Sequence, residues 1–363
     1  MDSFVLFSKN SHNTVTLKPF TYLTPSIRTI TIWNIAILAV QVVLLALAKS
    51  YSALIVIACA VTGSLLADVI YNLVSRQTSI SWIIAVMQGL VIGFLLPATY
   101  PPAAVLIITF VCLMLNKYMF GGFAASWANP VALTVAVCYF LDMNLFPSYG
   151  LTLMDLQNKN PALSMIEQGT FATYPFDAVI TDFLNNTVFS LFKVSIPTGY
   201  VSLFWDNGSL IPAFRFNFIT LVSSILLLSF DMIDFIIPMC FLVVYSVLVK
   251  FLSPVMVGGI LNQGDIILAL LTSGMLFSTL FVLQWYGTTP VTAAGKVFYG
   301  ILAGIIAFFI IGCGTSSVGY VFVILIMNVI SPIIQVIESK NTRNRIERIL
   351  LPHLNKMKGG QNV

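Results

Sequence analysis

The sequence predicts an all-helical protein that crosses a membrane about ten times. Only 8% of its 363 residues are charged and 58% are hydrophobic, whereas a soluble domain carries about 25% charged residues. The mean hydropathy is +0.97, so the chain has too few polar side chains to cover a surface in water. Its apolar runs lack strict alternation, which favours membrane-spanning helices over an outer-membrane barrel.

The expected helices follow from the length of the apolar runs. About 20 residues, each rising ~1.5 Å, cross a hydrocarbon core roughly 30 Å thick. Ten runs come close to this length, the shortest of them 297–312. They lie at residues 29–48, 51–70, 80–99, 102–120, 127–147, 213–231, 233–252, 264–285, 297–312 and 316–336. A long, less hydrophobic segment separates the first five from the last five. The chain is therefore divided into 1–28, 29–147, 148–212, 213–336 and 337–363.

The positions of Lys and Arg predict the orientation. With the N-terminal segment 1–28 in the cytoplasm, twelve of the 17 basic residues fall in inside segments and five fall outside. This bias agrees with the positive-inside rule. Ten spans then place the basic tail, 337–363, in the cytoplasm as well and the loop 148–212 outside. The excess of four positive charges is interpreted as an orientation signal rather than as a nucleic-acid-binding surface.

The two groups of five helices are expected to form an inverted repeat. Five is an odd number, so the second half would enter the membrane from the opposite side. Each third run contains glycine, in Gln88–Gly93 and Thr272–Leu276, and a Gly/Pro element follows at Gly121–Pro130 and Gly287–Pro290. Interrupted backbone at membrane depth lies in buried positions or lines a wet cavity. Ordinary helix ends and small-residue packing remain an alternative explanation.

Ionisable residues inside the apolar runs are functional candidates. Asp68 and Asp142 lie near helix ends, and Asn116 and Lys117 precede the first Gly/Pro element. The five cysteines are widely spaced, so we expect no metal site and no iron–sulfur cluster held by this chain alone. Nucleotide-binding and metalloprotease motifs are not found in the sequence. These features predict no complete catalytic site in the chain.

Four stretches carry a family resemblance. They are Pro25–Arg28 before the first helix, Phe120–Val131 with its Gly-Gly and Asn-Pro pairs, Glu167–Thr173 in the loop, and Thr289–Gly300 with Pro-Val-Thr and Gly-Lys. Together they resemble the NqrB/RnfD family, the membrane subunits of sodium-pumping NADH:quinone oxidoreductases and of Rnf ferredoxin:NAD oxidoreductases. The short N-terminal segment is more similar to RnfD. The resemblance implies the same two-half membrane fold.

The loop stretch resembles the family's flavin-attachment motif. The resemblance implies that Thr173 carries FMN through a phosphoester bond made by a flavin transferase. It also implies that Glu167, Thr170 and Ala172 belong to the motif. Asn129 and Gly122, in the broken element of the first half, are candidates for contacts to a flavin ring edge or a small cation, and a second flavin is left open.

The chain also departs from the family pattern. Glu167 stands where the motif has Asp, Thr170 where it has Ser, and Phe171 where it usually has Gly. Thr289 replaces the Asp before Pro-Val-Thr. These departures leave open a flavin-free structural paralogue in the same complex.

The resemblance implies a flavin-carrying subunit of an Rnf-type ion-translocating oxidoreductase. Electrons would pass between ferredoxin and NAD partners, coupled to Na⁺ or H⁺ movement. The expected location is the bacterial cytoplasmic (inner) membrane, among other membrane and peripheral subunits, in contact with lipid and with no nucleic acid. A secondary transporter or channel fits ten helices in an inverted repeat equally well.

Overall fold

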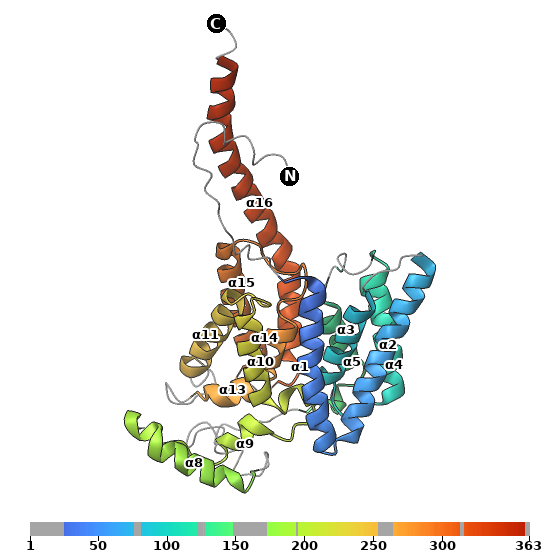
Figure 1. Cartoon of the computed structure of the whole chain (residues 1–363), viewed down its shortest axis with the longest axis vertical. Coiled ribbons are helices and arrows are strands. Elements are labelled where there is room, and N and C mark those ends of the chain that lie inside the picture. The colour runs from blue at the N-terminus through green and yellow to red at the C-terminus, as the bar shows by residue number, and fades with distance from the viewer. Residues whose placement is uncertain are drawn as a thin grey trace, which may run out of the picture.

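The computed structural model describes residues 25–75, 81–121, 126, 128–147, 173–193, 195–252, 264–312 and 316–359. Within these ranges the regular structure is helical and contains no β-strand. The prediction of an all-helical protein is therefore confirmed for the described part of the chain. Figure 1 shows a helical bundle with one long helix extending from it.

The first half of the bundle is an array of five helices. In chain order they are α1 (Ile27–Leu47), α2 (Tyr51–Ser75), α3 (Ser81–Leu95), α4 (Pro102–Leu113), which continues as the π-helical turn η2 (Met114–Tyr118), and α5 (Pro130–Leu141), followed by the 3₁₀ turn η3 (Met143–Leu145). These helices coincide with the first five predicted runs, and their ends differ by a few residues.

Short helices follow and lead into the second half. They are α8 (Phe176–Thr187), η4 (Phe189–Phe192), α9 (Tyr200–Trp205) and η5 (Pro212–Phe214). The second half then contains α10 (Asn217–Ser229), α11 (Ile236–Phe251), α13 (Ile266–Thr272), α14 (Met275–Phe281), α15 (Ala293–Ile311) and α16 (Gly319–Gly359). The last of these helices runs through residue 337 without a break, so the apolar span and the basic tail as far as Gly359 form one helix.

The bundle has the composition of a multi-pass membrane protein. Four helices are long and apolar enough to cross a membrane: Ile27–Leu47, Tyr51–Ser75, Ala293–Ile311 and Gly319–Arg348. Five further apolar helices are shorter, at Trp82–Leu95, Pro102–Tyr118, Pro130–Leu141, Asn217–Ser229 and Ile236–Phe251. Each of the ten predicted runs thus contains helix, while ten complete crossings stay a prediction.

The distribution of side chains across the bundle is that of a protein in lipid. Large apolar residues such as Val43 on α1 and Val74 on α2 are exposed. Polar residues such as Gln41, Ser64 and Gln88 are buried between helices. Within a bilayer, polar groups must find partners inside the protein while apolar groups face the acyl chains. The outward apolar surface therefore identifies the lipid-facing side of each helix.

Glycines allow close helix packing in both halves. A Cβ at Gly89 of α3 would come within 2.5 Å of Val61 Cα on α2, and one at Gly93 would come within 2.6 Å of Ile57 Cα. In the second half, a Cβ at Gly300 of α15 would lie 2.7 Å from Cys240 Cβ on α11. Small residues let helix backbones approach closely in membranes. The glycine run of α3 is therefore explained by packing against α2.

The glycine of the corresponding run in the second half has a different role. The predicted run 264–285 is interrupted at Ser273 and Gly274, which separate two seven-residue helices, α13 and α14. Gly274 has φ +68°, and the ring of Phe214 occupies the space where a Cβ would lie. Glycine tolerates this left-handed conformation without steric cost. The third element of the second half is therefore a discontinuous helix.

Polar bridges join the two halves. Gln41 Nε2 on α1 donates to Thr220 Oγ1 on α10 over 3.2 Å, and Asn129 Nδ2 donates to the carbonyl of Val282 over 2.8 Å. The first residues of α1 lie at the same end of the bundle as the projecting part of α16 (Figure 1). In the same view α8 and α9 lie at the opposite end. The segment 173–205 is thus separated from the projecting part of α16 by the thickness of the bundle.

Candidate functional site

Thr173 lies at the surface, directly before a firmly held stretch of chain. Its side chain is exposed, and three residues later α8 begins at Phe176. The backbone N–H of Tyr174 donates to Ser202 Oγ over 3.0 Å, and the phenol of Tyr174 donates to Asp206 Oδ2 over 3.3 Å. The main chain beside Thr173 is therefore anchored to α9 while the threonine itself stays accessible.

The anchor continues through the buried carboxylate of Asp177. It accepts hydrogen bonds from Gly199 N at 2.7 Å, from Ser202 N and Oγ, both at 2.6 Å, and from Thr181 Oγ1 at 3.0 Å. Gly199 is the N-cap of α9, so the carboxylate satisfies N–H groups at the start of that helix. Burial raises the pKa of Asp177, whereas these hydrogen bonds lower it by a larger amount. The pKa therefore lies below its usual value. The carboxylate therefore stays charged and holds α8 against α9.

A second carboxylate ties this region to the second half. Asp206 accepts from Arg215 through both oxygens, Nε to Oδ1 at 2.8 Å and Nη2 to Oδ2 at 2.6 Å. Both side chains are largely buried. Paired guanidinium–carboxylate contacts of this geometry are strong and directional. Burial and the neighbouring Asp206 carboxylate raise the pKa of Tyr174 above its usual value, so this phenol remains a hydrogen-bond donor.

The predicted flavin residues are distributed over separate parts of the chain. Thr173 is described above, whereas Glu167, Thr170, Ala172 and Gly122 lie outside the described residues. Asn129 is buried and caps α5, because its Oδ1 accepts from Val131 N and Ala132 N while its Nδ2 binds the second half. The amide nitrogen carries two N–H donors, so a contact to a flavin ring need not break any of these bonds.

Asn129 and Thr173 also lie at different depths. The α3–α4 connection lies next to the segment after α9, since Ala98 N donates to Leu210 O over 2.8 Å. The same connection contacts the C-terminal part of α5, where Tyr100 donates to Cys138 O over 3.0 Å. Asn129 precedes Cys138 by nine residues of helix, which is a distance of about 14 Å. Asn129 and Thr173, both candidates from the sequence, therefore lie in two separate regions of the structure.

A buried polar network lies between α2, α3 and η2. Lys117 Nζ donates to Gln88 Oε1 at 2.9 Å and to Tyr118 Oη at 3.1 Å. Tyr118 Oη donates to Asp68 Oδ1 at 2.9 Å, and Asn72 Nδ2 donates to Asp68 Oδ2 at 3.0 Å. Lys117 is 0% exposed and Asp68 is 1% exposed. A cation and an anion are thus linked through one phenol inside the bundle.

This network can relay a proton or compensate a moving cation. Protons can pass from the Lys117 ammonium through the Tyr118 hydroxyl to the Asp68 carboxylate, because each group donates to the next. Ionisable residues at membrane depth are costly and mark ion or proton pathways. π-helical turns such as η2 are frequent at functional sites. Asp68 and Lys117 are candidates from sequence alone, but their connection through Tyr118 becomes visible only in the structure.

Asp142 has a simpler role in the structure. It ends α5 and caps the turn η3, with its Oδ1 accepting from Asn144 N at 3.2 Å. Its carboxylate is used in this local structure. Of the two carboxylates that the sequence nominates, Asp68 is therefore the one connected to a membrane-buried cation.

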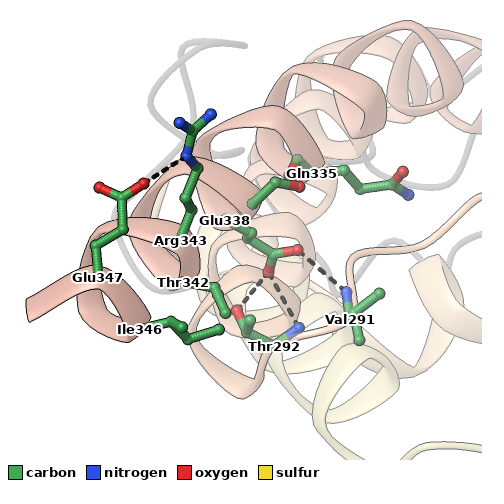
Figure 2. A pocket seen from close by; sticks show the side chains of 9 residues that line it. Val291, Thr292, Gln335, Glu338, Thr342, Arg343, Ile346 and Glu347 are labelled. Atoms are coloured by element: carbon green, nitrogen blue, oxygen red, sulfur yellow. Dashed lines mark hydrogen bonds and ion pairs between the residues drawn. The ribbon is translucent and has the colours of Figure 1, made fainter. Parts of the chain in front are cut away.

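The Pro-Val-Thr element is held by α16, as Figure 2 shows. Glu338 accepts from Val291 N at 3.2 Å, from Thr292 N at 3.1 Å and from the Thr292 hydroxyl. Thr292 in turn caps α15 by accepting from Gly295 N. A groove of about 670 Å³ lies along this contact, between the element and the first exposed turns of α16. The element is therefore positioned by a residue 46 positions further along the chain.

Two more contacts support the same corner. Gln335 Nε2 donates to the carbonyl of Thr289 at 3.1 Å, the residue that stands where the family has Asp. Lys296 forms an ion pair with Asp234 in the turn between α10 and α11. Asp234 and Glu338 lack a motif in the sequence, and only their contacts reveal these roles.

The described ranges contain no group of three or more His, Cys, Asp or Glu side chains placed to hold a metal ion. Cys59, Cys112, Cys138 and Cys240 are free thiols.

Comparison with known proteins connects these features to a family. A model of the NQR2, RnfD, RnfE family matches residues 14–343. The chain is also similar to the D component of the ion-translocating oxidoreductase complex of Haemophilus ducreyi (strain 35000HP / ATCC 700724), with 25% identity over 276 residues. That alignment covers 71% of this chain and 78% of the relative. Because the family match extends over both halves and the segment between them, the chain belongs to the NQR2, RnfD, RnfE family.

Proposed function

We propose that this chain is a membrane subunit of an Rnf-type ion-translocating oxidoreductase complex and carries FMN on Thr173. Family membership and the name of the Haemophilus ducreyi relative support the type of complex. The proposal includes the bacterial inner membrane, cytoplasmic termini, two inverted five-helix halves, and ferredoxin and NAD as the electron partners of the complex. The partners of this chain would be the other subunits, a flavin transferase and lipid.

The exposed, anchored position of Thr173 is the observation that carries the flavin proposal. A phosphoester requires a hydroxyl that a transferase can reach, and Thr173 is exposed. A useful redox group also requires a fixed attachment point, which the hydrogen bonds of Tyr174 to Ser202 and Asp206 supply. The chain offers accessibility and rigidity at the same residue.

The surroundings of Thr173 are compatible with a phosphate group. The nearby carboxylates of Asp177 and Asp206 are engaged by N–H, hydroxyl and guanidinium donors, so their negative charge is compensated. The rings of Tyr174 and Phe176 stack with centroids 5.4 Å apart and present a flat aromatic surface beside the attachment point. When bound, FMN would supply one- and two-electron redox chemistry that side chains lack.

The network of Asp68, Tyr118 and Lys117 is the part of the chain we propose for coupled Na⁺ or H⁺ movement. It joins three helices of one half and is closed to solvent. Buried ionisable groups in membranes respond strongly to a nearby charge, since the local dielectric is low. Proton transfer along this chain of donors would therefore respond to a change of charge close to the network.

The mass of the intact chain tests the flavin proposal directly. After co-expression with a flavin transferase, we expect an increase equal to one FMN less one water, together with flavin fluorescence of the denatured chain in a gel. Peptide mapping should locate the increase on the peptide containing Thr173. An unmodified mass under these conditions would contradict the proposal and favour a flavin-free paralogue.

A secondary transporter is the second candidate, and the discontinuous element α13–α14 favours it. Transporter binding sites are commonly built from interrupted helices at mid-membrane. A transporter has no use for a covalent flavin in a loop at one end of the bundle. The same mass measurement therefore separates the two functions.

A further inference from the structure

Helix α8 packs against the protein with its polar side. Asp177 and Thr181 are buried against α9, and Asn185 is half-buried and bonded to Ile196 through both ends of its amide. The opposite side carries Phe176, Val179, Ile180 and Phe183, all of them exposed, with Val179 at 71% and Phe183 at 64%. An amphipathic helix on a soluble protein has the reverse arrangement.

The exposed apolar face continues beyond α8. Val188 and Leu191 extend it into η4, where Leu191 is 79% exposed. Apolar surface in water costs about 25 cal/mol for each Å², and large contiguous patches mark membrane or protein contacts. The orientation of α8 is nevertheless fixed by three hydrogen bonds, which Gly199 and Ser202 at the start of α9 donate to the Asp177 carboxylate. An apolar medium must therefore cover the outward face.

An apolar groove connects this face with a lipid-facing helix of the bundle. It has a volume of about 310 Å³ and lies between α8, η4, α9, α10 and α13. Ile180 of α8 and Phe218 of α10 both line it. Phe218 also begins the exposed stripe Phe218, Leu221, Val222 and Ile225, whose i, i+3, i+4, i+7 spacing forms one face of α10.

The position of α8 agrees with a location at the boundary of the bilayer. Figure 1 shows α8 lying across the bundle axis, at the end where α9 also lies. Trp205, at the end of α9, is 45% exposed and its ring lies 6.3 Å from that of Phe218. Tryptophan is enriched at membrane–water interfaces. The apolar face of α8, the groove and the stripe of α10 thus form one surface at this level.

We propose that α8 and η4 form an interfacial helix that rests in the bilayer, with a lipid acyl chain in the groove between Ile180 and Phe218. The polar side holds the protein and the apolar side faces the acyl chains, as in helices that lie in the plane of the interface. Continuity with the lipid-facing stripe of α10 favours lipid over a protein partner. This position of α8 would hold Thr173, three residues before the helix, at the membrane–water boundary. The proposal for α8 does not depend on whether Thr173 carries a flavin.

Photo-crosslinking in native membranes, with the chain in its complex, tests whether the apolar face of α8 contacts lipid. The probe is p-benzoylphenylalanine, introduced one position at a time as Phe183→Bpa, Asp182→Bpa and Ile225→Bpa. Ile225 on α10 is the positive control because it lies on the lipid-facing stripe, and exposed Asp182 on α8 is the matched control outside the apolar face. We expect lipid adducts with the probe at positions 183 and 225 and no lipid adduct with the probe at position 182. The mass of the crosslinked peptides measures these adducts.

Each other outcome contradicts the proposal that the apolar face of α8 contacts lipid. A protein adduct at Phe183 in place of lipid would identify the face as a subunit interface. No adduct at Phe183, with lipid adducts at Ile225, would show that the face is in water. Equal lipid adducts at positions 183 and 182 would mean that α8 does not turn one defined face toward the lipid. None of these results bears on the mass increase expected at Thr173, so the two proposals fail independently.

Discussion

At the scale of single residues, the region around Thr173 contains both an accessible hydroxyl and the groups that hold it in place. Thr173 is exposed, whereas Asp177 and Asp206 beside it are buried and fully used in hydrogen bonds to α9 and Arg215. The attachment point and its support are therefore different residues, and substitutions can separate them.

Replacing Thr173 by alanine should abolish covalent flavin and leave the fold intact. The hydroxyl is the attachment atom, and an exposed substitution changes stability by roughly ±0.5 kcal/mol. Thr173→Ser should retain flavin because a hydroxyl remains, and Thr170→Ala should reduce the modification without removing it. Thr198→Ala, at an exposed threonine of the same region, is the matched control and should load normally. In-gel fluorescence and peptide mass measure all four, and a fluorescent Thr173→Ala chain would place the flavin elsewhere.

Replacing Asp177 by asparagine should loosen α8 without removing the attachment site. Asparagine has one acceptor oxygen, so it cannot accept both the bond that Gly199 donates to Oδ1 and the bond that Ser202 N donates to Oδ2, and each unsatisfied donor costs about 1–3 kcal/mol. We expect faster proteolysis within residues 173–205 and reduced flavin loading. Asp182→Asn, on the exposed side of α8, should behave like the wild type. Equal protease resistance of both variants would contradict the anchoring role.

The contribution of Asp177 should depend on pH with a definite sign. Its pKa in the folded protein lies below the ordinary value of 3.8. Its stabilisation is therefore complete above that value and is lost as the pH falls through the lower folded pKa. Wild-type protease resistance of this region should be constant at neutral pH and decline only in strong acid. A decline between about pH 5 and 7 would point to a different group.

At the scale of elements, α16 belongs to the bundle in its first part and positions a loop near its middle. Its 41 residues make a helix about 60 Å long, which exceeds the hydrocarbon thickness of roughly 30 Å. Gln335 and Glu338 contact the Pro-Val-Thr element near the point where the helix becomes exposed. The helix therefore connects the bundle with whatever lies beyond the membrane at that end.

Glu338→Ala should release the Pro-Val-Thr element, since it removes the acceptor of Val291 N and of Thr292 N and Oγ1. We expect the free energy of unfolding to fall by about 1–3 kcal/mol. We also expect increased labelling of a cysteine introduced at Val291. The matched control is Glu347→Ala, because Glu347 forms only an exposed pair with Arg343, and such pairs contribute about 0–1 kcal/mol. Thermal unfolding in detergent compares the two, and equal unfolding temperatures would contradict the clamp.

At the scale of the whole molecule, the buried network couples charge to the stability of the first half. Lys117→Met removes the buried cation that is linked to Asp68 through Tyr118, and removing one charge of a buried pair costs up to about 3–5 kcal/mol. The double variant Asp68→Asn with Lys117→Met removes both charges and should unfold at a higher temperature than Lys117→Met alone. Both variants should lose ion movement in vesicles containing the intact complex. Normal ion movement in the double variant would exclude the network from the pathway.

Sidedness is also a property of the whole molecule and stays a prediction. The split of basic residues predicts cytoplasmic termini and an external segment 148–212. In the structure α8 lies at the opposite end of the bundle from the projecting part of α16 (Figure 1), so the two segments should face different compartments. Cysteines introduced at Asn158 and Gly360 should be labelled from outside and from inside, respectively. Labelling of Asn158 only from the cytoplasm would reverse the topology and exclude an external flavin.

The helices and the family could be predicted from the sequence because both depend on local information. Membrane helices require only a run of apolar residues of sufficient length, and motifs such as Asn129-Pro130 and Pro290-Val291-Thr292 are contiguous. The single run at 264–285 is less simple, because Ser273 and Gly274 interrupt it in a conformation stabilised by contact with distant Phe214. A glycine in an apolar run does not reveal whether the helix continues or breaks there. Gly89 and Gly93 lie within the continuous helix α3, whereas Gly274 lies at a break.

The sequence by itself determined the class of protein, the approximate helices and the family motifs, including Thr173. Only the tertiary structure decided which polar groups meet: Asp177 with the start of α9, Asp68 with Tyr118 and Lys117, and Glu338 with Val291 and Thr292. These partners are 22 to 50 residues apart in sequence, and their composition does not reveal which groups pair. The outward apolar face of α8 has the same origin. The three hydrogen bonds from Gly199 and Ser202 to Asp177 fixed which side of that helix faces the protein, and hydrophobic periodicity alone predicts the opposite side.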